Sequence, residues 1–229
     1  MKYEVMYNVE IGELANTSRG LRLSSVDKNL DTDSQHQKPR GRLKIKEAEK
    51  IKNDKSILRC KILNFSNLNA LNKGESLDRL PIYAVNADRK NKKENIFVKK
   101  NDIVINTFLL ENKSNVLQIQ NEVNLNYVYS ELVFVIRVNE EIIDPNYVYT
   151  ILSSDYFQQH LLDVAIKGKA IKYRMSLEIL KNIKIPILSE ESKKKFYAEY
   201  NKKKKLEQEL KKVNEQFNND IEAIAKLTK

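Results

Sequence analysis

The sequence predicts a mixed α/β (α+β) globular domain followed by one long C-terminal helix. Three observations lead to this class. Short runs rich in Ile, Val and Tyr alternate with amphipathic segments of helical period. No segment repeats. Beyond residue 189 the strand-like runs stop, and apolar residues recur at steps of three and four without Gly or Pro. We therefore expect a domain at residues 1–188 and a helical arm at residues 189–229.

The first half of the domain should be dominated by strands. A short strand-like start and a helical turn are predicted between Tyr7 and Ala15, and a polar segment from Asn16 to Arg42 is predicted to be either a functional loop or partly disordered. The strand candidates share β-branched and aromatic residues between polar ones. They are Ile57–Leu63, Ile96–Val98, Ile103–Phe108, Val116–Ile119 and Leu132–Val138.

The second half of the domain should be mainly helical. Helices are predicted at Pro145–Ser153, Tyr156–Val164 and Leu177–Asn182. Proline suits the first position of a helix, where no amide donor is needed, and Ser176 is placed to cap the third helix. A short strand at Ile183–Leu188 should precede the arm.

The arm carries an apolar stripe that a small domain cannot cover, because a helix from Glu190 to Leu227 would span roughly 55 Å. Its three- and four-residue steps are broken once, where Lys203 occupies a position expected to be apolar, and mixed charges fill the other faces, as in a coiled coil. We expect this stripe to bind a second helix. Its residues are Phe196, Tyr200, Leu206, Leu210, Val213, Phe217, Ile221, Ile224 and Leu227.

Basic charge points to a polyanionic partner. The chain has 41 Lys and Arg against 31 Asp and Glu, a net charge of +10. The alternative is that the net charge only reflects a Lys-rich composition and has no function. However, the arginines cluster in polar segments, and arginines in such segments typically contact the DNA grooves and phosphates. We predict that Arg19, Arg22, Arg40, Arg42 and Lys44 read bases, and that Lys167, Lys169, Lys172 and Arg174 hold phosphates.

No pattern in the sequence predicts a catalytic, cofactor or metal site. Five scattered glycines form no phosphate-binding loop, and two histidines are too few for a multi-histidine metal site. The single cysteine, Cys60, is predicted to fill the core. No apolar run approaches the length of a membrane span, and the start of the chain is too polar for a secretory signal. We therefore expect a cytoplasmic protein without a membrane association.

Several fragments of the sequence occur in an order that resembles the specificity subunits of type I restriction-modification systems. The opening Val9–Ala15 with Gly20 is similar to the start of their target-recognition domain. Asn101–Val104 resembles an internal Gly-Asp-Ile-Leu segment, with Asn101 in the glycine position. Ile136–Val138, Ile143–Pro145 and Tyr147 resemble an Arg-then-Asp-Pro-x-Tyr passage, and residues from Lys167 to Ile187 resemble the closing signature before the helix. The helix entry departs from the family, with Leu188–Ser192 in place of its usual Pro-rich stretch.

The resemblance implies a DNA-recognition subunit without catalytic activity. A full subunit of this family has two recognition domains and two helices, whereas this sequence has one of each. We therefore expect two copies to pair through antiparallel arms and to read a bipartite, palindromic DNA site. The family also implies partners: methyltransferase subunits, which bring S-adenosylmethionine, and a translocating endonuclease subunit.

Other interpretations remain open from the sequence. The chain could be a coiled-coil adaptor that binds protein alone, and it could be a nuclease or methyltransferase that acts by itself, although the missing Gly-rich loop weighs against the latter. Within the family, pairing with a different half-subunit would give an asymmetric DNA target.

Overall fold

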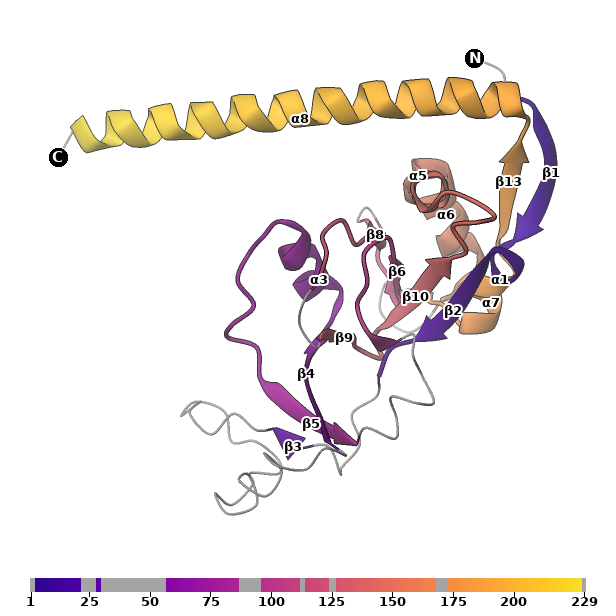
Figure 1. Ribbon diagram of the computed structural model, residues 1–229, viewed down its shortest axis with the longest axis horizontal. Coiled ribbons are helices and arrows are strands. Elements are labelled where there is room, and N and C mark those ends of the chain that lie inside the picture. The colour runs from indigo at the N-terminus through magenta and orange to yellow at the C-terminus, as the bar shows by residue number, and fades with distance from the viewer. Residues whose placement is uncertain are drawn as a thin grey trace. The chain divides into compact units, whose positions relative to one another are not determined.

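The computed structural model describes residues 3–21, 28–29, 57–86, 96–111, 114–123, 127–167 and 173–227 (Figure 1). The chain separates into two compact units. One contains residues 9–185, and the other contains residues 1–8 and 186–229. Strands β1 (Val5–Glu10) and β13 (Lys184–Leu188) form a two-stranded sheet, and both cross the division between the units.

The larger unit is built around a four-stranded antiparallel sheet, hereafter the central sheet. Its order is β2 (Ala15–Arg19), β10 (Val133–Val138), β6 (Ile103–Asn106) and β8 (Val116–Gln118). Strand β10 pairs on both sides, with Ile136 opposite Thr17 and Ile103. Its apolar residues are buried almost without interruption, as expected for an inner strand covered on both faces.

A second four-stranded sheet has the order β3 (Lys28–Asn29), β5 (Ile82–Asn86), β4 (Ile57–Leu63) and β9 (Tyr127–Tyr129), in which β4 and β9 run parallel. Helix α3 (Phe65–Asn72) begins with a reciprocal capping box between Asn64 and Asn67. Its Leu68 is buried in a core cluster with residues of both sheets, among them Leu63, Val104 and Val135. This shared core joins the two sheets into one unit.

Short helices and a small sheet complete the larger unit. The helices are α1 (Ile11–Leu14), α5 (Pro145–Ser153), α6 (Asp155–Val164) and α7 (Leu177–Lys181), and the three-stranded sheet has the order β11 (Ile166–Lys167), β12 (Tyr173–Arg174) and β7 (Phe108–Leu109). The predicted caps are confirmed: Pro145 lies at the start of α5, and the Ser176 hydroxyl accepts a hydrogen bond from the Ile179 amide.

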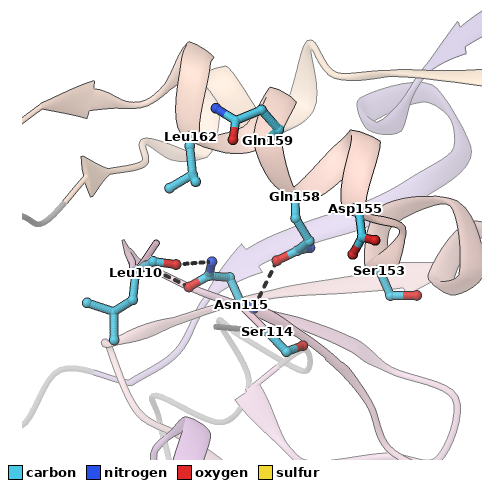
Figure 2. A pocket seen from close by; sticks show the side chains of 8 residues that line it. All are labelled: Leu110, Ser114, Asn115, Ser153, Asp155, Gln158, Gln159 and Leu162. Carbon is cyan, nitrogen blue, oxygen red and sulfur yellow. Dashed lines mark hydrogen bonds between the residues drawn. The ribbon is translucent and has the colours of Figure 1, made fainter. Parts of the chain in front are cut away.

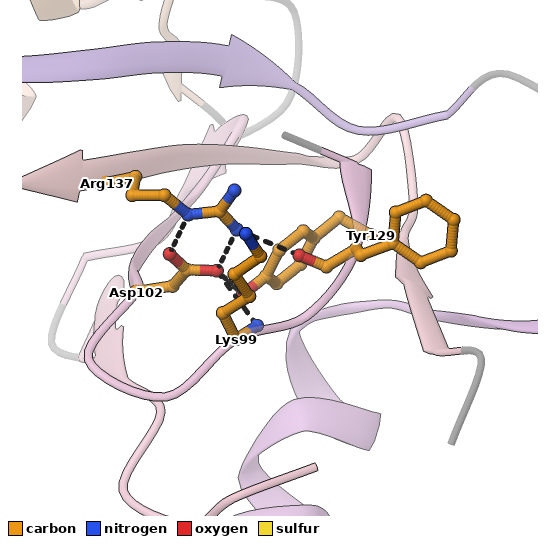
Figure 3. Close-up of polar contacts among 5 residues, drawn as sticks. Lys99, Asp102, Tyr129 and Arg137 are labelled. Carbon is orange, nitrogen blue, oxygen red and sulfur yellow. Dashed lines mark hydrogen bonds and ion pairs between the residues drawn. The ribbon is translucent and has the colours of Figure 1, made fainter. Parts of the chain in front are cut away.

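A buried ion pair connects the strands of the core (Figure 3). The Asp102 carboxylate, 1% exposed, accepts two hydrogen bonds of 2.7 Å from the Arg137 guanidinium. It also accepts one of 2.7 Å from the Tyr129 hydroxyl and one of 3.0 Å from the Lys99 amide. Burial alone would lower the pKa of Arg137, but the hydrogen bonds and charge of Asp102 raise it. Arg137 therefore stays charged and matches the buried carboxylate.

The same network predicts a loss of stability in alkali. Burial and the negative charge of Asp102 raise the pKa of Tyr129 well above its usual value, and burial raises the pKa of Tyr147 to about 12. In the unfolded chain both tyrosines lose their protons near pH 10, so the unfolded state is favoured as the pH rises from about 10 toward the folded pKa values. The free energy of unfolding should fall by up to about 1.4 kcal/mol per pH unit for each tyrosine. Urea unfolding between pH 8 and 11 measures this slope, and Tyr129→Phe should make it shallower; equal slopes would contradict the assignment.

The smaller unit contains the long helix α8 (Glu190–Leu227) of 38 residues. At the start of the helix, the Ser189 hydroxyl accepts a hydrogen bond of 3.4 Å from the Ser192 amide. The hydroxyl of Ser192, which is buried, accepts a hydrogen bond of 2.9 Å from the Glu4 amide. Along the helix, Phe196 and Tyr200 of the predicted stripe are partly buried, and the next five residues of the stripe are exposed to solvent. The exposed fractions are 56% for Leu206, 61% for Leu210, 64% for Val213, 62% for Phe217 and 51% for Ile221.

The predicted fold class is confirmed, while several elements differ from the prediction. Ile96–Val98 is not a strand but a turn with one isolated bridge, from Phe97 to Val128. The expected strand Ile103–Phe108 is split at Thr107. The polar segment predicted from Asn16 onward begins with strand β2, which is held in place by its pairing with β10. Helix α3 and strands β5 and β9 were not predicted. Cys60 is buried, as expected for a core residue.

Candidate nucleic-acid interface

Several loops meet at one end of the central sheet. Because neighbouring strands are antiparallel, the last residues of β2 and β6 lie at the same end as the first residues of β10 and β8. The residues after Arg19, the turn before Val133 and the described residues that follow Asn106 and precede Val116 therefore emerge together. We call this end, with residues 19–21, 107–111, 114–115, 130–132 and 173–175, the loop end of the sheet.

Strand β2 is fixed to the loop end by close backbone contacts. The Arg19 side chain donates a hydrogen bond of 2.8 Å from Nε to the Glu131 carbonyl. The Leu21 amide donates to the Tyr129 carbonyl at 2.7 Å, and the Glu131 amide donates to the Leu21 carbonyl at 2.9 Å. Between them, Gly20 passes so close to Ser130 that a Cβ atom on Gly20 would lie 2.1 Å from the Ser130 carbonyl oxygen. Glycine is the one residue type that fits this approach.

Strand β12 is attached to the other side of the same turn. Both the amide and the hydroxyl of Thr107 donate hydrogen bonds of 2.9 Å to the Leu132 carbonyl, and the Thr107 carbonyl accepts one of 3.1 Å from the Met175 amide. Next to this contact, Arg174 pairs with Phe108 across β12 and β7. Arg19 and Arg174, which are far apart in the sequence, therefore both lie at the loop end.

The loop end combines two exposed arginines with exposed apolar groups, and it also contains Glu111 and Glu131. Arg19 and Arg174 are exposed, as are Phe108 (38%) and Leu132 (43%). Guanidinium groups recognise phosphates and guanine edges, and apolar side chains can contact thymine methyl groups or bases. Phe108 and Leu132 were not predicted as site residues, because in the sequence they look like ordinary members of apolar strands. Their position at the strand ends exposes them.

The structure describes only part of the predicted DNA-binding set. Besides Arg19 and Arg174, it describes the backbone of Lys167, which is the last residue of β11 and pairs with β12 in the small sheet. The other predicted residues lie outside the described part of the chain; they are Arg22, Arg40, Arg42, Lys44, Lys169 and Lys172.

A polar pocket of about 490 Å³ lies between α6 and the residues Leu110, Ser114 and Asn115 (Figure 2). Its amides are used internally: Asn115 bonds to both the amide and the carbonyl of Leu110, and Gln158 accepts from the Asn115 amide at 3.0 Å and donates to the Leu152 carbonyl at 2.7 Å. The lining contains the carboxylate of Asp155 and no cation. The pocket thus disfavours phosphate, and its hydrogen bonds hold the loop end against α6.

In the described part of the chain, no group of three or more His, Cys, Asp or Glu side chains is placed to hold a metal ion. Among the described helices, none is both long enough and apolar enough to cross a membrane. The buried Asp102, with its four hydrogen bonds, has a structural role.

No protein family and no curated protein sequence matches the chain. Among the solved structures that are similar to it are the following two. The type I restriction-modification S subunit from M. genitalium is 14% identical, with a TM-score of 0.41 over 80% of this chain and 34% of that chain. The HsdS subunit from Thermoanaerobacter tengcongensis is 13% identical, with a TM-score of 0.49 over 95% of this chain and 46% of that chain. The chain thus spans less than half of either neighbour.

Proposed function

We propose that this chain is a DNA-specificity subunit of a type I restriction-modification system. It binds duplex DNA through the loop end of the central sheet and has no catalytic role of its own. The observation that carries the proposal is that the exposed Arg19 and Arg174 both lie at the loop end, beside exposed apolar side chains. The ordered family-like fragments and the net charge of +10 support it.

Helix α8 supplies the second part of the proposal. Its exposed apolar stripe would be covered by the same helix of a second copy, running antiparallel, so that two-fold symmetry places one DNA-reading domain at each end. Each domain would read one half of a palindromic site, with an unread spacer between the halves. Methyltransferase subunits carrying S-adenosylmethionine, and an endonuclease subunit, would assemble on this pair. Adenine methylation would then require base flipping by the methyltransferase.

Selection from a pool of random DNA duplexes tests the DNA-reading part. We expect enrichment of two short motifs in inverted orientation with a constant spacer, and an affinity that falls steeply with salt concentration because phosphate contacts release counterions. Failure to bind any duplex at low salt would contradict the proposal and favour a protein-binding adaptor.

Arg174→Gln tests the loop end directly. Removing an exposed guanidinium that contacts DNA should weaken binding by about 1–3 kcal/mol. If Arg174 holds a phosphate, the loss should be the same for all sequences and the salt dependence should become less steep; if it reads a base, specificity should relax at one position. Fluorescence anisotropy with the selected duplex measures both. Lys100→Gln is the matched control, because Lys100 is exposed and precedes β6 at the opposite end of the sheet. Equal effects of the two variants would refute the placement.

A further inference from the structure

Three charged residues occupy core positions of the α8 heptad. With Phe196 at position a, the heptad places Glu199 and Asp220 at d positions and Lys203 at an a position, and the neighbouring Ile221 continues the stripe after Asp220. Lys203 and Asp220 flank the central apolar part of this face. The uninterrupted positions between them are Leu206, Leu210, Val213 and Phe217.

The spacing of these residues is symmetric. In an antiparallel pair of identical helices, two positions face each other when they are equally far from the two-fold axis. An axis midway between residues 211 and 212 places Lys203 opposite Asp220. The same axis places Leu210 opposite Val213 and Leu206 opposite Phe217, so each apolar core residue between Lys203 and Asp220 meets another apolar residue. Toward the ends of the helix, Phe196 lies opposite Leu227 and Glu199 lies opposite Ile224.

We infer that α8 pairs with α8 of a second copy in this register, and that Lys203 of each copy bonds to Asp220 of the other. The inference rests on the proposed dimerisation and specifies its orientation and register. A polar pair inside an apolar seam is a known way of selecting one register.

Other arrangements of the two helices leave the charges of Lys203 and Asp220 uncompensated. Sliding one helix by a heptad would place Lys203 opposite position 213 or 227, both apolar, and bury an ammonium group without an anion. A parallel pair would place Lys203 opposite Lys203 and Asp220 opposite Asp220. It would also align the basic run Lys202–Lys205 with itself, whereas the antiparallel pair brings this run beside the acidic end of the helix, which contains Glu215, Asp220 and Glu222.

The contacts within one helix are compatible with this exchange. Lys203 lies 3.7 Å from Glu207, and Asp220 accepts a hydrogen bond of 2.9 Å from Gln216. Both are exposed contacts between residues four apart, which contribute little to stability. Lys203 can therefore turn toward an anion on a second helix at small cost.

Charge exchange at the two positions tests the register. In the proposed dimer, Lys203→Asp and Asp220→Lys each create two like-charge contacts, so each should raise the dissociation constant of the dimer more than about tenfold. The double variant K203D/D220K should dimerise like the unmodified chain, and an equimolar mixture of the single variants should form heterodimers. Sedimentation equilibrium at several concentrations measures these constants. Lys205→Asp is the matched control, because it makes the same charge change on an exposed residue that points away from the seam.

The outcomes separate this inference from the proposed function. If the unmodified chain dimerises but the single variants dimerise equally well, or if the double variant does not recover, the register is refuted and the dimer stands. If the unmodified chain is monomeric at every concentration, both the homodimer and the register are overturned, while DNA binding by the single domain is tested separately. Far-UV circular dichroism of each variant shows that a lost dimer is not a lost fold.

Discussion

Replacing Arg137 by Met should lower the free energy of unfolding by about 3–5 kcal/mol. The substitution keeps much of the side-chain volume but removes the cation that bonds twice to Asp102 at 2.7 Å. Asp102 is 1% exposed, so its carboxylate cannot recover this interaction from solvent. It must either stay ionised with fewer partners or take up a proton. Urea unfolding at neutral pH, followed by circular dichroism, measures the loss.

The control is an ion pair at the surface. Lys100 and Glu122 lie 3.4 Å apart with both side chains largely exposed, so Lys100→Met should cost less than about 1 kcal/mol. A double variant, Asp102→Asn with Arg137→Met, should lose less than the sum of the two single variants, because it leaves no unpaired charge. A loss below about 1 kcal/mol for Arg137→Met would show that the buried pair does not stabilise the fold.

Gly20→Ala should destabilise the chain by about 3 kcal/mol through steric overlap. The added methyl group would lie 2.1 Å from the Ser130 carbonyl oxygen and 2.5 Å from that of Tyr129, and both are backbone atoms that cannot rotate away. Relieving the overlap requires the end of β2 to separate from the turn that carries Glu131. Since Arg19 is bound to this turn, we also expect weaker DNA binding in whatever fraction remains folded.

Gly12→Ala is the corresponding control. A Cβ atom on Gly12 would lie 3.4 Å from the Lys181 side chain, which is an ordinary contact. Thermal unfolding of the two variants should therefore give a much lower midpoint for Gly20→Ala than for Gly12→Ala. Similar midpoints would mean that the loop end is more deformable than its hydrogen bonds indicate.

The family-like fragments of the sequence meet as structural contacts. Asn101 has a φ of 67°, a left-handed conformation that glycine adopts most readily, and it stands where the resembling segment has glycine. The next residue, Asp102, bonds to Arg137, which belongs to another fragment. The Ile11 amide donates to the Ile183 carbonyl and so joins the opening fragment to the closing one. These contacts lie toward the end of the central sheet opposite the loop end.

Elements with a strong local signal were predicted well from the sequence. The strand Ile57–Leu63, the helix Pro145–Ser153 and the long helix Glu190–Leu227 have the predicted bounds. In each of these elements, the hydrophobic period and the residues at the two ends indicate the same type of secondary structure. Helix α3 was missed because four of the nine residues from Asn64 to Asn72 are asparagines, which favour caps and turns over helix interiors. Its capping box and the burial of Leu68 stabilise it.

The sequence by itself determined the fold class, the long helix with its apolar stripe and the excess of basic charge, because periodicity, capping and composition are local properties of the chain. The tertiary structure alone decided which distant residues meet: β4 beside β9, Asp102 on Arg137, Arg19 on Glu131 and Arg174 beside Phe108. Such contacts depend on strand order and on a shared core that buries both sheets. No short window of sequence contains that information, because each of these contacts joins two segments that are far apart along the chain. The local conformational preferences of one segment do not specify which distant segment it will contact.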